Sequence, residues 1–169
     1  LCSGWRARAE LRVLHWLEPM VTLDVIELSR RFGRHRVLER LSFSVLPGEV
    51  VGITGPNGSG KSTLLQLLAG LQRPTSGRIV YRGEGELTPR EARLRLGFVS
   101  PALSLYDSLS AAENLEFSAR WRGITVDVPA LLERVGLSPR RHELLAAYST
   151  GMRQRVKLAW ALMHRPDCL

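Results

Sequence analysis

The sequence predicts an α/β domain in which short strands alternate with helices and a glycine-rich loop joins one strand to one helix. Three observations support this fold class. Residues 49–54 are a short apolar run with β-branched side chains, which is typical of a buried parallel strand. Residues 55–60 are rich in glycine, and residues 61–69 carry leucines at helical spacing before Gly70 ends the helix. This order of strand, loop and helix is typical of α/β domains.

The remaining elements are expected on both sides of this unit. Residues 21–28 and 41–46 alternate apolar and polar side chains, which predicts two strands separated by a basic turn at 30–36. Shorter strands are expected at 78–81 and 96–99. Capping residues and apolar spacing predict helices over residues 89–95, 108–122, 129–135 and 149–163. The second of these begins near Ser110, where Glu113 completes the spacing of a capping box.

Composition and charge narrow the class of protein. The 169 residues carry a net charge of +8, which raises nucleic acid or an acidic membrane as partners. The excess is arginine, since only Lys61 and Lys157 are lysines, and the arginines are scattered rather than clustered. We therefore favour a solvated basic surface over a nucleic-acid stripe. The two cysteines, Cys2 and Cys168, form no zinc-type spacing, and a reducing compartment fits them better than a disulfide framework.

The N-terminal stretch differs from the rest of the chain. The sequence begins with Leu1, and residues 1–19 lack the apolar core and cleavage site of a signal peptide. Met20 stands directly before the first predicted strand, so residues 1–19 are expected to be an extension outside the domain. The alternative is a short interfacial helix with an apolar face made by Leu11, Leu14, Trp16 and Leu17.

The glycine-rich loop carries the clearest chemical motif. It fits the pattern G-x-x-x-x-G-K-[ST] with the residues Gly55-Pro56-Asn57-Gly58-Ser59-Gly60-Lys61-Ser62. Glycines allow the backbone to approach a ligand, and successive N–H groups form an anion nest at the start of a helix. Lys61 supplies a positive charge for the outer phosphates of ATP, Ser62 supplies a ligand for Mg²⁺, and Thr63 adds a hydroxyl near the inner phosphates. The context of strand, loop and helix identifies the motif as a P-loop.

A second motif opens the last predicted helix with the residues Tyr148-Ser149-Thr150-Gly151-Met152. Ser149 is a suitable N-cap, and Gly151 leaves the start of the helix open to a close partner. Taken alone, these residues also fit an ordinary helix cap.

Together these motifs resemble the nucleotide-binding subunit of an ABC transporter over residues 20–169. The resemblance implies a P-loop NTPase fold with an antiparallel β subdomain, a helical subdomain at about 100–150, and a C-terminal part that is absent. It makes Gly55–Thr63 the Walker A motif and Tyr148–Met152 a divergent form of the L-S-G-G-Q signature. Ser149, Thr150, Gly151 and Met152 would then face ATP held by a second ATP-binding subunit in a head-to-tail dimer.

The resemblance also implies an adenine contact and a membrane partner. Phe32 resembles the aromatic residue that stacks on adenine, although a core phenylalanine at a strand end is the open alternative. Residues 97–115 resemble the segment that contacts a transmembrane permease subunit, which implies a peripheral position on the cytoplasmic face of the membrane. The family's Q-loop glutamine is absent: its position falls on Ala102, after Ser100 and Pro101. Any coupling would run through Ser100 or the backbone.

No catalytic residue is assigned within this chain. In the family, the Walker B aspartate, its neighbouring glutamate and the switch histidine follow a sequence like Arg165-Pro166-Asp167, and Asp167 itself precedes the Walker B strand. Hydrolysis is therefore expected of the complete protein and to be slow or absent in these residues. The sequence favours the ATP-binding subunit of a transporter with no nucleic-acid partner. The alternatives are a soluble ABC-type ATPase acting on nucleic acid or ribosomes, and a non-hydrolysing fragment.

Overall fold

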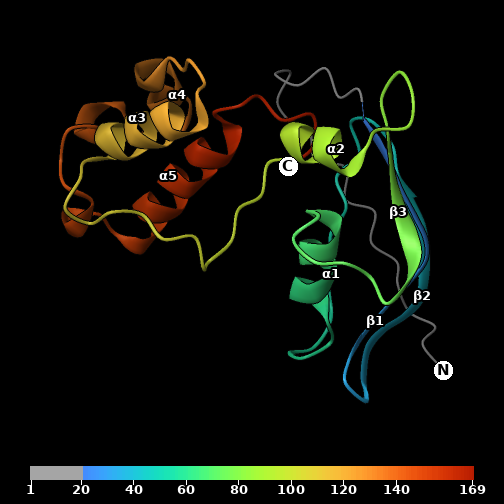
Figure 1. Cartoon of the computed structure of the whole chain (residues 1–169). Helices are drawn as coiled ribbons and strands as arrows, with labels where there is room; N and C mark the ends of the chain where they lie inside the picture. Colours follow the sequence, from blue (N-terminus) through green and yellow to red (C-terminus); the bar gives the residue numbers. More distant parts are fainter. Residues whose placement is uncertain (1–20) are drawn as a thin grey trace. The chain divides into compact units, whose positions relative to one another are not determined.

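The computed structural model describes residues 21–169, so the predictions for residues 1–20 lie outside the described part of the chain. The described residues divide into two compact units (Figure 1). The first runs up to Leu94 and includes Cys168, and the second comprises Arg95–Asp167 together with Leu169.

The first unit is built on a three-stranded antiparallel sheet, in the order β2-β1-β3. Its strands are β1 (Thr22–Phe32), β2 (His35–Val45) and β3 (Ser76–Arg82). The strands predicted at 21–28, 41–46 and 78–81 are confirmed, but the basic segment 30–36 is mostly strand rather than turn, because Phe32 pairs with His35 across a two-residue turn. Gly33 supplies the left-handed backbone for this turn with a φ of 58°. The ladder includes the pair of Arg31 with Arg36, and both of these residues are exposed, so their charged side chains are compatible with strand pairing.

An irregularity in β1 keeps its apolar side chains on the core face. Leu23 and Val25 are buried at the expected spacing of two, but the next buried residue is Leu28. The register of the sheet shifts between Val25 and Leu28, and Glu27 lies there with a φ of 46°. This extra residue forms a β-bulge, which shifts the alternation by one position so that Leu28 faces the core. Gly77 on β3 lies opposite, where a Cβ atom would come within 2.3 Å of the Glu27 carbonyl oxygen.

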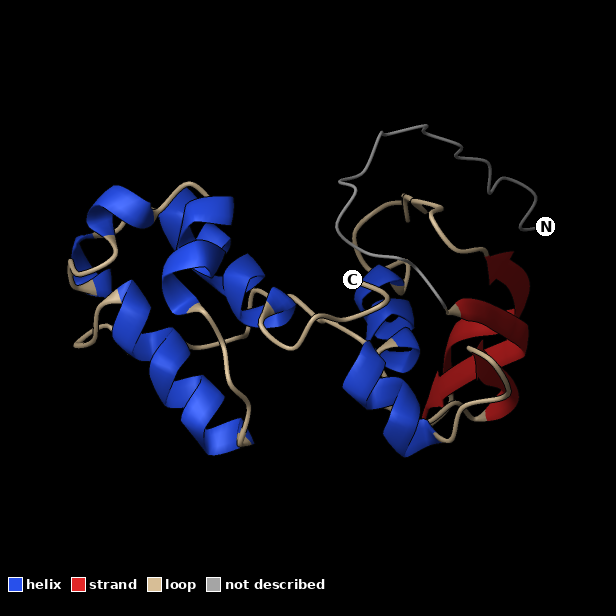
Figure 2. Ribbon diagram, turned by 90° about the horizontal axis from the view of Figure 1, so that it is seen from above, coloured by secondary structure: helices blue, strands red, loops and turns tan. Residues whose placement is uncertain are grey.

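The helices α1 (Lys61–Leu68) and α2 (Pro89–Arg95) follow the prediction, and α1 lies beside one face of the sheet (Figure 1, Figure 2). Leu64 and Leu67 are the buried side chains of α1, and Tyr81 on β3 donates a hydrogen bond to the Leu68 carbonyl. Burial raises the pKa of Tyr81 to about 12. The sheet and α1 therefore share one small core.

Two predicted strands do not form. Residues 49–54 belong to no strand of the described chain, and Val50 and Val51 are 39% and 46% exposed. Residues 96–99 likewise form no regular strand. An apolar, β-branched composition suits a buried strand, but a strand also requires a hydrogen-bonded neighbour. Among the described residues, 49–54 has none.

The second unit is helical and contains α3 (Ala111–Arg122), α4 (Val128–Arg134) and α5 (Thr150–Leu162), which are labelled in Figure 1. These agree with the predicted helices to within a few residues. Two short 3₁₀ turns, Ser138–Arg140 and Leu145–Ala147, were not predicted. The three helices enclose a core whose fully buried members include Ala111, Leu115, Leu132, Leu145, Val156 and Ala159.

Local polar contacts fix the start of α3. The predicted capping box is confirmed: Ser110 Oγ accepts from Glu113 N at 3.2 Å, and Ser110 N donates to Glu113 Oε2 at 2.7 Å. Asn114 is only 1% exposed, and both the oxygen and the nitrogen of its side-chain amide make hydrogen bonds. Its Oδ1 accepts from Tyr106 N at 2.8 Å, and its Nδ2 donates to the carbonyls of Tyr106 and Ser110 at 3.0 and 2.9 Å. The loop before α3 is thus tied to the helix.

A half-buried histidine joins the end of α5 to the start of the second unit. His164 Nε2 donates to the Leu96 carbonyl at 3.0 Å, and its Nδ1 accepts from Arg122 at 3.3 Å. The Arg122 guanidinium also lies 4.0 Å from the centroid of the Trp160 ring. Burial lowers the pKa of His164, and the nearby Arg122 charge lowers it further against the opposing effect of the Leu96 carbonyl.

The described residues include neither a membrane-spanning helix nor a cluster of metal ligands. Between residues 21 and 169, no helix has the length and apolar content that crossing a bilayer requires. Over the same residues, no three histidine, cysteine or acidic side chains gather in a way that could hold a metal ion.

Candidate functional site

The P-loop has a backbone that favours glycine. Gly55, Gly58 and Gly60 have φ angles of 149°, 83° and 92°, which side-chain-bearing residues rarely adopt. Gly60 is also crowded, because a Cβ atom there would lie 2.8 Å from Val37 Cγ1 and 3.1 Å from the Val37 carbonyl oxygen. The last glycine of the loop therefore packs directly against β2.

Lys61 lies at the start of α1 and folds back over the loop. Its Nζ donates to the carbonyl oxygens of Gly55 and Pro56, both at 2.8 Å. These partners are neutral, so the ammonium charge remains available to an anion. Within the described helix α1, the N-cap Gly60 makes no side-chain capping bond and the first turn holds no acidic residue. Open N–H groups, a helix dipole and a lysine charge converge there, which is the chemistry that a phosphate requires.

The other residues of the motif are placed consistently with a triphosphate. Ser62 and Asn57 are exposed, and Thr63 is half-buried. The Ser59 Oγ is buried without a hydrogen-bond partner, 2.9 Å from where a Cβ of Gly55 would lie. A buried hydroxyl without a partner is costly unless a ligand satisfies it. The donors present in the loop thus fit a nucleotide phosphate chain, with Ser62 free to reach a metal ion.

Phe32, the predicted adenine contact, is the last residue of β1. It is 46% exposed, so it is not the core phenylalanine that was the alternative. The Arg30 guanidinium lies 4.5 Å from the centroid of its ring. An exposed aromatic ring at this position can stack on a planar ligand, and its role as the adenine contact stays a prediction.

The signature segment lies at the start of α5 in the second unit. Ser149 is the N-cap, as the sequence predicted, and its Oγ accepts from Met152 N at 3.3 Å. Thr150 and Gly151 are exposed, and no atom lies within 4 Å of where a Cβ of Gly151 would stand. The exposed side of this helix start is therefore open to a close partner.

The residues on either side of Ser149 and Gly151 both contact Arg140. The Tyr148 hydroxyl donates to the Arg140 carbonyl oxygen at 2.6 Å, and Arg140 Nη1 donates to Met152 Sδ at 3.4 Å. Sequence reasoning did not single out Arg140, because it stands outside the motif and belongs to a 3₁₀ turn that carries no strong sequence signal.

Similarity to known proteins agrees with these motifs. A model of the ABC transporter family matches residues 38–169. The chain belongs to this family.

Over the aligned residues, curated relatives in the ABC transporter family are about a third identical to this chain. The ABC transporter ATP-binding protein YxlF of Bacillus subtilis is 38% identical over 152 residues, covering 87% of this chain and 50% of the relative. The linearmycin resistance ATP-binding protein LnrL of the same organism is 34% identical over 154 residues, covering 87% and 49%. The chain spans about half the length of these relatives.

Solved structures confirm the predicted fold. The structure of an ATP-binding subunit of an ABC transporter has a TM-score of 0.68 at 31% identity. CbiO1 of Clostridium perfringens, described as part of the ABC transporter complex cbiONQ, has a TM-score of 0.72 at 27% identity. In both cases the match covers 85% of this chain and 62% of the other. The α/β class and the ABC-type ATPase fold are therefore as predicted.

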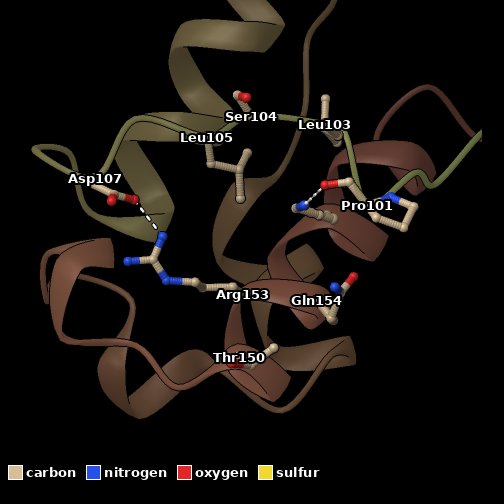
Figure 3. Close-up of a pocket in the computed structure, with 9 residues that line it drawn as sticks. Pro101, Leu103, Ser104, Leu105, Asp107, Thr150, Arg153 and Gln154 are labelled. Carbon is tan, nitrogen blue, oxygen red and sulfur yellow. Dashed lines mark hydrogen bonds and ion pairs between the residues drawn. The ribbon is translucent and has the colours of Figure 1, made fainter.

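The segment that resembles the ABC family's Q-loop lies over α5. Ala102 N donates to Ser100 Oγ at 3.2 Å, and Lys157 Nζ donates to the Pro101 carbonyl at 2.8 Å. A salt bridge of 2.5 Å joins Arg153 to Asp107, as Figure 3 shows. Between the segment and the helix lies a pocket of about 380 Å³, lined by residues that include Leu103, Leu105, Thr150 and Gln154. The pocket contains no residue of the P-loop, which forms an open surface loop instead.

Proposed function

We propose that this chain is part of the ATP-binding subunit of an ABC transporter, and that it binds the phosphates of ATP through Gly55–Thr63. The observation that carries the proposal is the start of α1, where Lys61 and an uncapped helix N-terminus lie behind a loop of positive-φ glycines. The names of relatives support the transport role. One is the bacitracin transport ATP-binding protein BcrA of Bacillus licheniformis, which is 35% identical over 150 residues.

Mg²⁺ accompanies the nucleotide in this proposal. Ser62 would hold it through an exposed hydroxyl, and when bound the ion neutralises charge on the outer phosphates. Lys61 would leave the Gly55 and Pro56 carbonyls to meet the same phosphates. Asn57 and Thr63 are further candidate phosphate contacts, and Phe32 is the candidate adenine contact.

The proposed partners are a second ATP-binding subunit and a transmembrane permease. Ser149, Thr150, Gly151 and Met152 would face ATP bound to the second subunit, which agrees with the open surface at Gly151. The permease would contact residues within 97–115, on the cytoplasmic face of the membrane. We place the helical subdomain within residues 100–150 of the second unit and assign no catalytic base within residues 21–169. ATP hydrolysis coupled to transport is proposed for the complete protein.

The two lysines provide a direct test of nucleotide binding. Lys61→Ala should weaken binding of a fluorescent ATP analogue at least tenfold, because charge-assisted hydrogen bonds are worth about 1.5–3 kcal/mol. Lys157→Ala removes the same charge from α5, where its Nζ contacts the Pro101 carbonyl, and should leave the affinity unchanged. Equal affinities for Lys61→Ala and the unmodified chain would contradict the P-loop assignment.

The two N-cap serines provide a test of dimerisation. Ser149→Ala should spare nucleotide binding by the monomer but weaken dimerisation driven by a non-hydrolysable ATP analogue, measured by size-exclusion chromatography. Ser110→Ala removes the N-cap of α3 in the same unit and controls for the loss of helix stability, about 1 kcal/mol in each case. If both variants dimerise alike, the assignment of Ser149 to the partner's nucleotide is wrong.

A further inference from the structure

Arg140 contacts both ends of the exposed signature segment. Its carbonyl oxygen accepts the Tyr148 hydroxyl hydrogen bond, and its guanidinium reaches Met152 Sδ from the other side. The guanidinium also lies 5.8 Å from the centroid of the Tyr148 ring. Arg140 therefore restrains Tyr148 through its main-chain carbonyl and Met152 through its side chain, while Ser149 and Gly151 are exposed.

Glu143 holds the Arg140 side chain in this position. Arg140 Nε lies 2.9 and 2.8 Å from the two carboxylate oxygens of Glu143, and Nη2 lies 2.5 Å from Oε2. A planar guanidinium bound in this forked way has little rotational freedom, so the third nitrogen, Nη1, keeps its direction toward Met152. The pKa of Glu143 is lowered by its hydrogen bond to Arg140, which agrees with a persistent pair.

Stability alone does not explain this arrangement. Both side chains are 45% exposed, and exposed ion pairs contribute at most about 1 kcal/mol. An ordinary surface pair such as Arg120 with Glu116 on α3 joins neighbouring turns of one helix. Arg140 instead joins a 3₁₀ turn to residues 148 and 152, across the start of α5.

We propose that Arg140 is a positioning residue for the signature segment. It fixes Tyr148 and Met152 so that Ser149 and Gly151 present a constant surface to the phosphate of ATP bound by a second copy of the subunit. The inference rests on the proposed function, because it requires the head-to-tail dimer. The Arg140 guanidinium acts through Met152 and makes no contact with the nucleotide.

The test separates dimerisation from nucleotide binding in the protein expressed from the whole reading frame that encodes this chain. Arg140→Ala keeps the main-chain carbonyl that accepts from Tyr148 and removes the guanidinium contact with Met152. It should weaken dimerisation with a non-hydrolysable ATP analogue about tenfold, while the monomer's affinity for a fluorescent analogue stays within about twofold. Arg120→Ala removes an exposed, paired arginine from α3 and should change neither quantity. Arg140→Lys keeps the charge but loses the fork, so it should behave like Arg140→Ala.

A double-mutant cycle shows whether Arg140 acts through Met152. Met152→Leu removes the sulfur acceptor at similar volume, and its effect on dimerisation should not add to that of Arg140→Ala. Full additivity, or full rescue by Arg140→Lys, would overturn the proposal. The proposal would also be overturned if Arg140→Ala lowered the melting temperature and the monomer lost nucleotide binding with it. If Arg140→Ala folds poorly, Glu143→Gln loosens the same fork and should weaken dimerisation in the same direction.

The outcomes also separate this inference from the proposed function. If the unmodified protein does not dimerise with nucleotide, the proposed head-to-tail dimer fails. If it dimerises and Arg140→Ala dimerises equally well, the proposed function stands and the positioning role is wrong.

Discussion

Substitution of Gly60 by alanine tests how the nucleotide loop is held. The residue has a φ of 92°, and its Cβ would lie 2.8 Å from Val37 Cγ1, 3.0 Å from Leu38 Cδ2 and 3.1 Å from the Val37 carbonyl oxygen. Left-handed backbone costs an L-residue about 1–2 kcal/mol. Overpacking against atoms close to the backbone adds about 1–3 kcal/mol. We expect Gly60→Ala to lower the free energy of unfolding by about 2–5 kcal/mol, as the sum of these two effects.

Two other glycines separate these contributions. Gly58 has a φ of 83° but open space around its Cβ position, so Gly58→Ala should show the backbone cost alone, about 1–2 kcal/mol. Gly52 has neither a positive φ nor an atom within 4 Å of its Cβ position. Gly52→Ala should therefore be neutral or slightly stabilising, since alanine restricts the unfolded chain.

Urea unfolding followed by circular dichroism measures the free energies, and a fluorescent ATP analogue measures affinity in the same variants. The expected order of destabilisation is Gly60→Ala, then Gly58→Ala, then Gly52→Ala. If Gly60→Ala were no more destabilising than Gly58→Ala, the contact between the loop and β2 would not constrain the loop, and the reasoning from packing would be refuted.

Three further predictions concern the units around the candidate sites. Gly77→Ala would place a Cβ 2.3 Å from the Glu27 carbonyl oxygen at a φ of 78°, so its midpoint of urea unfolding should fall by more than that of Gly58→Ala. Asn114→Leu would leave the Tyr106 N–H without its partner and should cost about 1–3 kcal/mol, measured by the same unfolding assay. Burial lowers the pKa of His164 below 6.5, so the unfolded chain binds its proton first as pH falls. Stability should be full above pH 6.5 and decline below it, and thermal melts of His164→Gln should lose this part of the pH dependence.

The sequence predicts helices better than strands in this chain, and the reason is physical. The start of α3 depends on Ser110 and Glu113, which are three residues apart, so the signal is contained in the helix itself. Residues 49–54 have the composition of a buried strand, but a ladder requires a second segment that composition does not identify. The β1–β2 hairpin is longer than predicted, because backbone hydrogen bonds pair its strands as far as Arg31 and Arg36. These bonds tolerate the charged side chains that made the segment look like a turn.

The same distinction applies to the candidate sites. The P-loop could be read from the sequence because its glycines, Lys61 and Ser62 are consecutive and their chemistry depends on local backbone conformation. The N-cap role of Ser149 was predictable on the same basis. The role of Arg140 was not predictable. Its partners Tyr148 and Met152 lie eight and twelve residues further along the chain, and only the 3₁₀ turn brings Arg140 close to them.

The β1–β2 hairpin links the two ends of the proposed nucleotide site. Phe32 is exposed at the turn of the hairpin, and Val37, five residues further along the chain, packs against Gly60. The candidate adenine contact and the support for the phosphate loop are therefore carried by one antiparallel ribbon. Because Gly60 has no side chain, β2 can approach the loop closely enough to restrict its backbone. The glycine thus serves two needs at once, since it permits the left-handed turn before α1 and makes room for the strand that holds this turn in place.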